Sequence, residues 1–334
     1  WDTGTRGIGV MVSDTLMFQR AAPTPSDAHL SNFFGLAMPM VKHGFPLEIV
    51  QMENLLQPGV LAECRVLLLT YEGQKPLKPE YHDALAEWVR GGGALLFVDD
   101  GKDPYNHVQE WWNAQGTTEA LPQDDLFARL GVDASAKAAP QAVGKGWVRW
   151  LDTAPSALAR DKNGPETLMP ALGTLCAKID LQLHMQNYLK LRRGPYVIAS
   201  VMNESKSDAP LRMQGRFIDL FDAKLPVIAE KTLEPDQRTL LYDLDWAKAN
   251  LGAAKVAAAA TRVREERFAD GKLSFTTRGP EGVHARVRIL LPSAPAEVRV
   301  TPETAFTQAW DAESGTLLLE FDNRADTLSV EVVL

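Results

Sequence analysis

The stretch CRVLLLTYEGQKPLKPEYHDALAEWVRGGGALLFVDDGKD, residues 64–103, decides the fold of this chain. It contains two short apolar runs, 65–70 and 94–98, separated by a Pro-marked loop and a segment of helical periodicity, 80–89. Two continuous apolar strands joined by a helix are typical of a parallel sheet that is covered on both faces. The pattern therefore predicts a β-loop-α-β unit, and ligands of such sheets bind beyond the carboxyl ends of the strands.

The segments on either side of this unit continue the alternation of strands and helices. We expect strands at 7–13, 46–50 and 144–151 and helices at 27–41, 104–112, 124–130 and 166–178. The alternation of 144–151 with period two is typical of an edge or half-exposed strand. The sequence thus predicts an α/β domain with a parallel sheet over residues 1–160, followed by a connecting helix, 161–180.

The pattern changes after about residue 180. Strand-like segments recur roughly every ten residues with turn signals between them, which is typical of an antiparallel sandwich. We expect them at 183–191, 195–202, 211–221, 225–233, 238–244, 262–268, 271–277, 283–290, 296–300, 305–310, 315–321 and 326–333. The sequence predicts β-sandwich segments at 181–245 and 261–334 with a helical linker at 246–260, as one sandwich or as two packed modules.

Composition excludes several classes of function. The 334 residues suggest two or three domains, and a net charge of −8 with no basic patch argues against nucleic acid or an anionic membrane as a partner. No apolar run approaches the roughly 18 residues that span a bilayer, so we expect a soluble protein. The first residue is Trp1 rather than Met, so we expect that an N-terminal segment is missing.

The two cysteines, Cys64 and Cys176, fit no metal motif by their spacing. One abuts a predicted buried strand and the other lies in an apolar helical stretch, so we expect buried free thiols, with a disulfide or a nucleophile as alternatives. The glycines of 7–9 do not complete a G-x-G-x-x-G loop, so we expect no dinucleotide cofactor.

An acidic turn follows the second strand of the opening stretch. Asp99, Asp100 and Asp103 place three carboxylates within five residues, with Asn106 close behind. Oxygen ligands of this kind suit Ca²⁺ or sugar hydroxyls at the carboxyl edge of a sheet. The alternative is that the carboxylates form Asx-turns and that Asp103 caps a helix that starts at Pro104.

His107, Trp111 and Trp112 follow the acidic turn at helical spacing. Exposed indoles are the usual platform for sugar rings, and here they would face the same crevice as the turn. The alternative is that the paired tryptophans are core or subunit-interface residues. Together the turn and this segment form the candidate ligand site.

The order of these parts is similar to that of a known enzyme class. The segments GIGVMVS (7–13), HGFPLEIV (43–50) and WVRGGGAL (88–95) resemble the flavodoxin-like, glutamine-amidotransferase-like domain that follows the catalytic barrel in β-galactosidase-type glycoside hydrolases. Segments 215–222 and 240–244 resemble the β-domains at the ends of such enzymes. The resemblance implies a flavodoxin-like α/β domain followed by antiparallel β-sandwich material, and a role in trimerisation.

The departures from this family limit the activity that we expect. Amidotransferases of the same superfamily carry a nucleophilic cysteine in a strained elbow after a strand. This chain instead has Asp99-Asp100-Gly101 after the strand at 94–98, where that elbow would lie. A catalytic barrel needs about 250 residues, which the β/α part does not provide.

We therefore interpret the chain as a non-catalytic C-terminal region of a carbohydrate-active glycoside hydrolase. It would support oligomerisation and line the sugar cleft. Its partner would be a catalytic barrel, located upstream in the same chain or on another chain. The assembly would be a periplasmic or secreted homo-oligomer. Two alternatives remain: a self-contained hydrolase in which Asp99 or Asp100 is the base and His107 the acid, and a carbohydrate-binding module.

Overall fold

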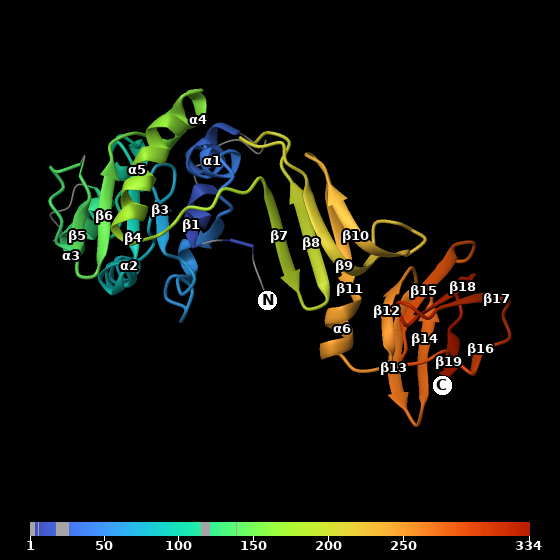
Figure 1. Cartoon of the computed structure of the whole chain (residues 1–334). Coiled ribbons are helices and arrows are strands. Elements are labelled where there is room, and N and C mark those ends of the chain that lie inside the picture. Colours follow the sequence, from blue (N-terminus) through green and yellow to red (C-terminus); the bar gives the residue numbers. More distant parts are fainter. Residues whose placement is uncertain (1–3, 6, 18–26, 115–120, 138) are drawn as a thin grey trace. The chain divides into compact units, whose positions relative to one another are not determined.

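The computed structural model describes residues 4–5, 7–17, 27–114, 121–137 and 139–334, which divide into two compact units. The first unit contains residues 4–187 and 204–208 and is built from helices around a parallel sheet (Figure 1). The second contains residues 188–203 and 209–334 and consists mainly of antiparallel strands. An α/β unit followed by antiparallel β-structure is the predicted fold class, which is confirmed.

The α/β unit has a six-stranded sheet with the order β2-β1-β3-β4-β6-β5. Its strands are β1 (Ile8–Val12), β2 (Glu48–Gln51), β3 (Val66–Leu69), β4 (Ala94–Val98), β5 (Gln141–Val143) and β6 (Gly146–Leu151). The first five in this order are parallel, which is the doubly wound flavodoxin-like order, and β5 adds an antiparallel edge.

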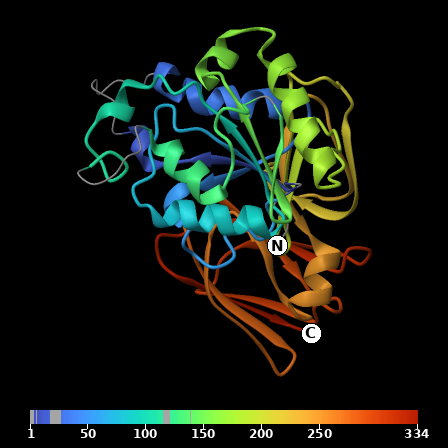
Figure 2. The same cartoon turned by 90° about the vertical axis from the view of Figure 1, so that its left-hand side faces the viewer.

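Helices cover both faces of this sheet (Figure 2). They are α1 (Asp27–Lys42), α2 (Glu80–Gly91), α3 (Pro122–Leu130), α4 (Pro155–Arg160) and α5 (Gly164–Lys178), with short 3-10 helices η1 (Asp14–Met17), η2 (Met52–Asn54) and η3 (Pro104–His107). Leu67 and Leu69 of β3 pack with α2 and α3, whereas Val66 and Leu68 pack with α1 and α5. The strand is apolar throughout because successive side chains enter different cores.

The structure decides between the expectations for this unit. Of the two forms expected for 144–151, the half-exposed strand is observed, because β6 begins with alternating buried and half-buried residues, whereas β5 forms a hairpin with it and takes the edge. The helix expected at 104–112 is only the single turn η3, after which Val108 is extended. The Asn113 amide bonds the carbonyl oxygens of Asn106 and Val108, which a longer helix would need for itself.

The expected connecting helix is instead part of the α/β core. Its counterpart α5 contributes Leu168, Leu172 and Leu175 to the cluster that also contains Leu96 of β4. Burial of these side chains, which are fully covered, fixes the helix against the sheet.

The β-unit begins with a five-stranded antiparallel sheet of order β10-β9-β11-β8-β7. Its strands are β7 (Tyr188–Arg193), β8 (Tyr196–Val201), β9 (Leu211–Asp219), β10 (Val227–Leu233) and β11 (Arg238–Asp243). The short helix α6 (Leu244–Asn250) follows, and the Asp243 side chain caps it by accepting a hydrogen bond from the Trp246 N–H.

The remainder forms a two-sheet sandwich with the orders β12-β15-β18-β17 and β13-β14-β19-β16. Its strands are β12 (Lys255–Ala259), β13 (Arg262–Ala269), β14 (Lys272–Arg278), β15 (His284–Leu290), β16 (Glu297–Thr301), β17 (Phe306–Asp311), β18 (Thr316–Asp322) and β19 (Leu328–Val333). Phe275 and Val330 of one sheet share a core with Val287 and Leu319 of the other. Sequence periodicity located each of the seven strands of 261–334.

Strand β12 occupies part of the stretch that the sequence assigned to a helical linker. The run is rich in alanine, which favours helices in isolation. Here its backbone pairs with β15, and this pairing with burial of Ala257 outweighs the weak local preference.

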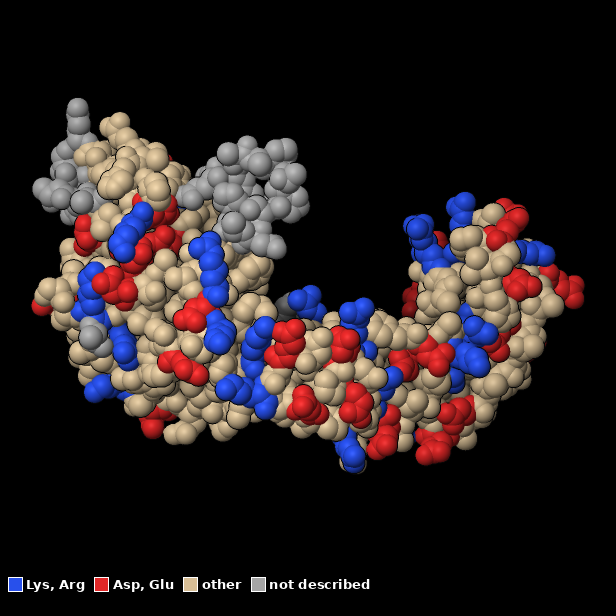
Figure 3. All heavy atoms as spheres, turned by 90° about the horizontal axis from the view of Figure 1, so that it is seen from above, with Lys and Arg blue, Asp and Glu red and all other residues tan. Residues whose placement is uncertain are grey.

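Two further findings concern the surface and the helices. None of the helices in the described residues is long and apolar enough to cross a membrane. On the face drawn in Figure 3, acidic and basic side chains are interspersed rather than gathered into one basic field.

Candidate functional site at the carboxyl edge of the parallel sheet

Strands β3 and β4 end side by side, because Leu69 pairs with Phe97 in parallel register. The residues that follow them therefore meet at one edge of the sheet. They are Thr70, Tyr71 and Glu72 after β3, and Asp99 and Asp100 after β4. This edge is where the sequence placed the candidate site.

Asp99 holds the ends of these two strands together. Its side chain is almost fully buried, and its carboxylate accepts hydrogen bonds from the N–H groups of Tyr71 (2.9 Å) and Gly101 (2.7 Å). Burial raises the pKa of Asp99, and the two amide bonds oppose that rise. Both carboxylate oxygens are engaged by backbone, so Asp99 acts as a structural clamp in this conformation.

Asp103 forms a buried ion pair with Lys75, at 2.7 Å between Oδ2 and Nζ. The carboxylate also accepts from the Gly73 N–H (2.7 Å) and, as the N-cap of η3, from the Tyr105 N–H (3.0 Å). Burial raises the pKa of Asp103, but Lys75 and the two amides outweigh it and the net pKa is lowered. The capping role that the sequence offered as an alternative is thus present, and Lys75 is a partner that sequence analysis did not identify.

Lys75 is itself unusual, because its ammonium group is nearly inaccessible. Burial lowers the pKa of Lys75, although Asp103 stabilises the charged form. The same ammonium donates a hydrogen bond to the Tyr71 carbonyl oxygen. Lys75 therefore joins the loop after β3 to the acidic turn after β4.

Glu72 and Asp100 follow the two neighbouring strand ends, and each shifts the pKa of the other. Burial, and then the nearby charge of Asp99, raises the pKa of Glu72 to about 8. Burial raises the pKa of Asp100 as well. The interaction with Glu72 and the hydrogen bond from the Lys102 N–H outweigh this effect, so the net pKa of Asp100 is lowered. At neutral pH the pair therefore holds one proton, with Glu72 as the acid and Asp100 as the carboxylate.

Glu72 was missed by the sequence analysis. It lies three residues after the last residue of β3, whereas Asp100 lies two after the last residue of β4. The sequence does contain a signal for this pair, since both predicted parallel strands are followed by acidic residues. Neighbouring parallel strands end at the same edge of the sheet, so these acids are expected to lie close together. The pair is the chemically distinct group of this edge, since its proton is held at a pH where ordinary carboxyls have lost theirs.

A buried chain of side chains lies beside the acidic turn. The Tyr71 hydroxyl is 2.6 Å from Nε2 of His82, and Nδ1 of His82 is 2.7 Å from Asp125 of α3. Burial lowers the pKa of His82 against the opposing effect of Asp125, and burial raises the pKa of Tyr71 well above its usual value. A neutral His82 that donates to Asp125 and accepts from Tyr71 satisfies all three groups. The chain links β3 to α2 and α3.

The other predicted site residues are placed differently from one another. Asn106 is buried and its Nδ2 donates to the Gly101 carbonyl oxygen (3.3 Å), whereas His107 is exposed on η3. Trp112 is only 1% exposed, and Trp111 is half-buried, bonded through Nε1 to the Pro76 carbonyl oxygen and packed edge-on against His82. The two indoles do not form the exposed platform that was considered for sugar rings, because Trp112 has no accessible face.

Neither cysteine has the environment of a nucleophile. Cys64 and Cys176 are free and buried. Burial raises the pKa of Cys64 to about 12 and that of Cys176 to about 11, which opposes thiolate formation. Asp99 and Asp100 do not adopt the left-handed φ of a strained elbow, since the positive φ of this turn is taken by Gly101 (71°).

The carboxylates of Asp99 and Asp103 at the acidic turn accept hydrogen bonds from backbone amides. Across the described parts of the chain, no three His, Cys, Asp or Glu side chains are grouped so that they could hold a metal ion.

Comparisons with known proteins place the chain in no family. No family model and no curated protein matches it. Among solved structures, it is similar to a β-galactosidase from Bacillus circulans sp. alkalophilus (10% identity over 72% of this chain and 42% of that one, TM-score 0.40). It is also similar to a GH42 β-galactosidase from G. stearothermophilus (12% identity over 71% of this chain and 40% of that one, TM-score 0.36). A third similar structure is a rhamnosidase from Novosphingobium sp. PP1Y (10% identity over 98% of this chain and 34% of that one, TM-score 0.29). The chain spans about two fifths of the length of the two β-galactosidases.

Proposed function

We propose that this chain is a non-catalytic supporting region of a carbohydrate-active glycoside hydrolase, with a glutamine-amidotransferase-like α/β domain followed by β-domains. Its catalytic barrel would lie upstream or on a partner chain. The assembly would be a homo-oligomer that acts on carbohydrate in the periplasm or outside the cell.

One observation carries the non-catalytic part of this proposal. At the edge where an amidotransferase places its nucleophile, this chain has Asp99, whose two carboxylate oxygens are engaged by the amides of Tyr71 and Gly101. An engaged carboxylate in an unstrained turn neither attacks a carbonyl carbon nor activates water. The turn is therefore suited to holding two strands together.

The carbohydrate part of the proposal rests on the sequence resemblance of 7–13, 43–50 and 88–95 to the domain that follows the barrel in β-galactosidase-type enzymes. The doubly wound strand order agrees with that resemblance. Oligomerisation is the role that such a domain serves in those enzymes.

Glycosidase assays of the chain alone test the proposal. We expect no turnover of nitrophenyl glycosides by the chain alone, and turnover when the polypeptide encoded upstream of Trp1 is expressed with it. Turnover by the chain alone that is lost in Asp99→Asn or Asp100→Asn would overturn the proposal, provided that the melting temperatures of the variants match that of the parent. Light scattering after size-exclusion chromatography tests the expected homo-oligomer.

The Glu72 and Asp100 pair favours a second candidate, a self-contained hydrolase. In this version Glu72, rather than the exposed His107, would be the general acid and Asp100 the base. It predicts turnover that falls as pH rises through about 8, because Glu72 then loses its proton. Glu72→Gln would abolish that turnover, whereas His107→Ala would leave it unchanged.

A further inference from the structure

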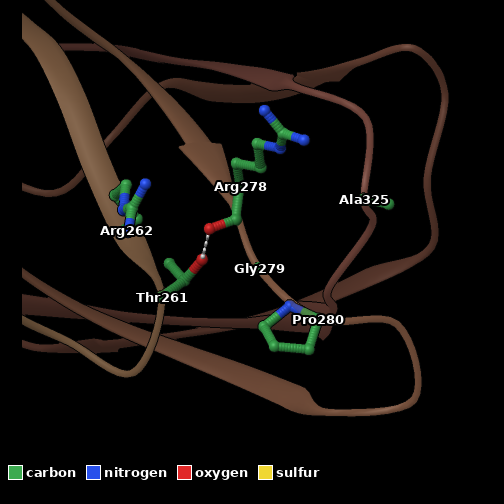
Figure 4. Close-up of a pocket in the computed structure, with 6 residues that line it drawn as sticks. All are labelled: Thr261, Arg262, Arg278, Gly279, Pro280 and Ala325. Atoms are coloured by element: carbon green, nitrogen blue, oxygen red, sulfur yellow. Dashed lines mark hydrogen bonds between the residues drawn. The ribbon is translucent and has the colours of Figure 1, made fainter.

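A hollow in the β-sandwich lies far along the chain from the acidic turn. It has a volume of about 520 Å³ and is lined by the start of β13, the end of β14 and two loops of the same sandwich (Figure 4). The lining residues are Thr261, Arg262, Arg278, Gly279, Pro280 and Ala325. Volumes of this size are typical of sites for small ligands.

Two arginines stand directly opposite each other on neighbouring strands of this hollow. Arg262 of β13 pairs with Arg278 of β14 in antiparallel register, so their side chains leave the same face of the sheet. Like charges in this arrangement repel each other. Figure 4 shows the two side chains leaving neighbouring strands, with the guanidinium of Arg278 directed away from Arg262 and the Arg278 carbonyl oxygen accepting a hydrogen bond from the Thr261 hydroxyl.

Arg262 and Arg278 belong to those arginines of the sandwich that have no acidic partner in the described residues. Arg286 binds Glu320 at 2.6 Å and Arg299 binds Glu297 at 2.6 Å. Neither Arg262 nor Arg278 forms an ion pair with any residue in the described ranges, and both side chains are exposed. Two guanidinium groups are thus available to an anion from outside the chain.

An unpaired buried amide lies behind one lining residue of the hollow. A Cβ atom on Gly279 would lie 2.5 Å from Cγ of Asn323, so the amide of Asn323 lies directly against this glycine. Asn323 is only 4% exposed, and within the described structure neither its Oδ1 nor its Nδ2 has a hydrogen-bond partner. Buried amides are normally paired, so Asn323 is an unsatisfied polar group behind Gly279 of the hollow.

We propose that this hollow binds the oxyanion of an acidic saccharide, either the carboxylate of a uronic acid or a sulfate ester. The planar forks of Arg262 and Arg278 match the oxygen pairs of either group. Pro280 and Ala325 supply an apolar wall on which the C–H face of a sugar ring packs. The saccharide part rests on the proposed function, whereas the oxyanion part does not.

Titration of the full chain with inorganic sulfate tests the oxyanion site on its own. We expect binding that weakens about tenfold or more in Arg262→Ala and in Arg278→Ala, because each removes a charge-assisted pair of hydrogen bonds. Arg278→Lys keeps the positive charge but not the planar guanidinium group, so we expect its sulfate affinity to lie between those of the parent and of Arg278→Ala. Both positions are exposed, so the three variants should fold, and an unchanged melting temperature verifies this.

Arg267→Ala is the matched control. Arg267 is an exposed arginine of the same strand, pairs across the sheet with Ser274 and does not line the hollow. We expect sulfate binding by this variant to equal that of the parent. If the parent and the double variant R262A/R278A bind sulfate equally, the hollow holds an adventitious ion only. That outcome would overturn the proposal.

A second arm identifies the source of the oxyanion. A glucuronate-containing oligosaccharide and a sulfated galacto-oligosaccharide are compared with their neutral counterparts. Tighter binding of either acidic sugar than of free sulfate, lost in R262A/R278A, supports the saccharide assignment and shows which group is read. Sulfate binding with no gain from either sugar would overturn that assignment. Neither result depends on turnover, so it is separable from the test of the proposed function.

Discussion

The carboxyl groups of Glu72 and Asp100 follow two neighbouring parallel strands, β3 and β4, and each shifts the pKa of the other. Burial, together with the charge of Asp99, raises the pKa of Glu72, so Glu72 keeps its proton. An acid that is protonated in the folded chain and ionised in the unfolded chain couples folding to pH.

Glu72 should make the protein less stable as pH rises. Its pKa is about 8 in the folded chain and 4.5 as an ordinary value, so the folded state binds more protons between these limits. The free energy of unfolding contributed by this group is therefore present below about pH 4.5 and is lost as pH rises through about 8. Relative to Glu72→Gln, we expect the free energy of unfolding of the parent to fall by roughly 1–2 kcal/mol between pH 5 and pH 8, after discounting for partial solvation.

Urea unfolding of both proteins at several pH values measures this loss. Because Asp99 and Asp103 remain in the variant, the difference between the two curves reports Glu72 together with its effect on Asp100. Parallel pH profiles would show that Glu72 is not protonated in the folded chain.

Lys75 should be required for stability although it is a charged residue. Lys75→Met leaves the buried carboxylate of Asp103 without its cation, and breaking a buried ion pair from one side costs about 3–5 kcal/mol. The double variant Lys75→Met, Asp103→Asn removes both charges, so we expect it to be more stable than Lys75→Met alone. A double-mutant cycle in urea measures the coupling, and additive effects would contradict the pair.

Gly35 should not tolerate a methyl group. A Cβ atom there would lie 1.8 Å from the Pro155 carbonyl oxygen, at the contact between α1 and α4. We expect Gly35→Ala to lower the free energy of unfolding by about 2 kcal/mol or more. Gly173 in α5 is the control, because nothing lies within 4 Å of its Cβ position, and Gly173→Ala should raise stability by about 0.5–1 kcal/mol. Equal melting temperatures for the two variants would show that the helix contact is looser than the structure has it.

Both thiols should be unreactive in the folded protein. The raised pKa values of Cys64 and Cys176 and their burial predict labelling by a disulfide reagent at pH 8 that is on the order of 100-fold slower than in denaturant. Cys176→Ala separates the two sites. Labelling of either cysteine at the unfolded rate without denaturant would refute the buried environment.

Local patterns in the sequence were sufficient for most of the elements. The apolar runs around Leu67 and Leu96 predicted β3 and β4 because a strand covered on both faces has no polar side. The turn signals of 261–334 predicted its seven strands. Such periodicities are local, and the forces that create them act within a few residues.

Expectations failed where a partner outside the segment decided the structure. The Ala-rich segment became β12 because β15 pairs with it, and of the two forms expected for 144–151 the edge is not observed because β5 turned back on the strand. The helix after Pro104 stopped early because Asn113 and Trp112 bond the carbonyl oxygen of Asn106. None of these partners can be read from the segment itself.

The candidate site shows the same division. The sequence determined that acids follow β4, that Asp103 precedes Pro104 and that no cysteine elbow is present. Only the tertiary structure decided that Lys75 neutralises Asp103, that Glu72 keeps its proton near Asp100 and that Arg262 pairs across the strands with Arg278 without an acid. The physical reason is that charge pairing and pKa shifts depend on distances across strands, which the register of a sheet fixes and the order of residues does not.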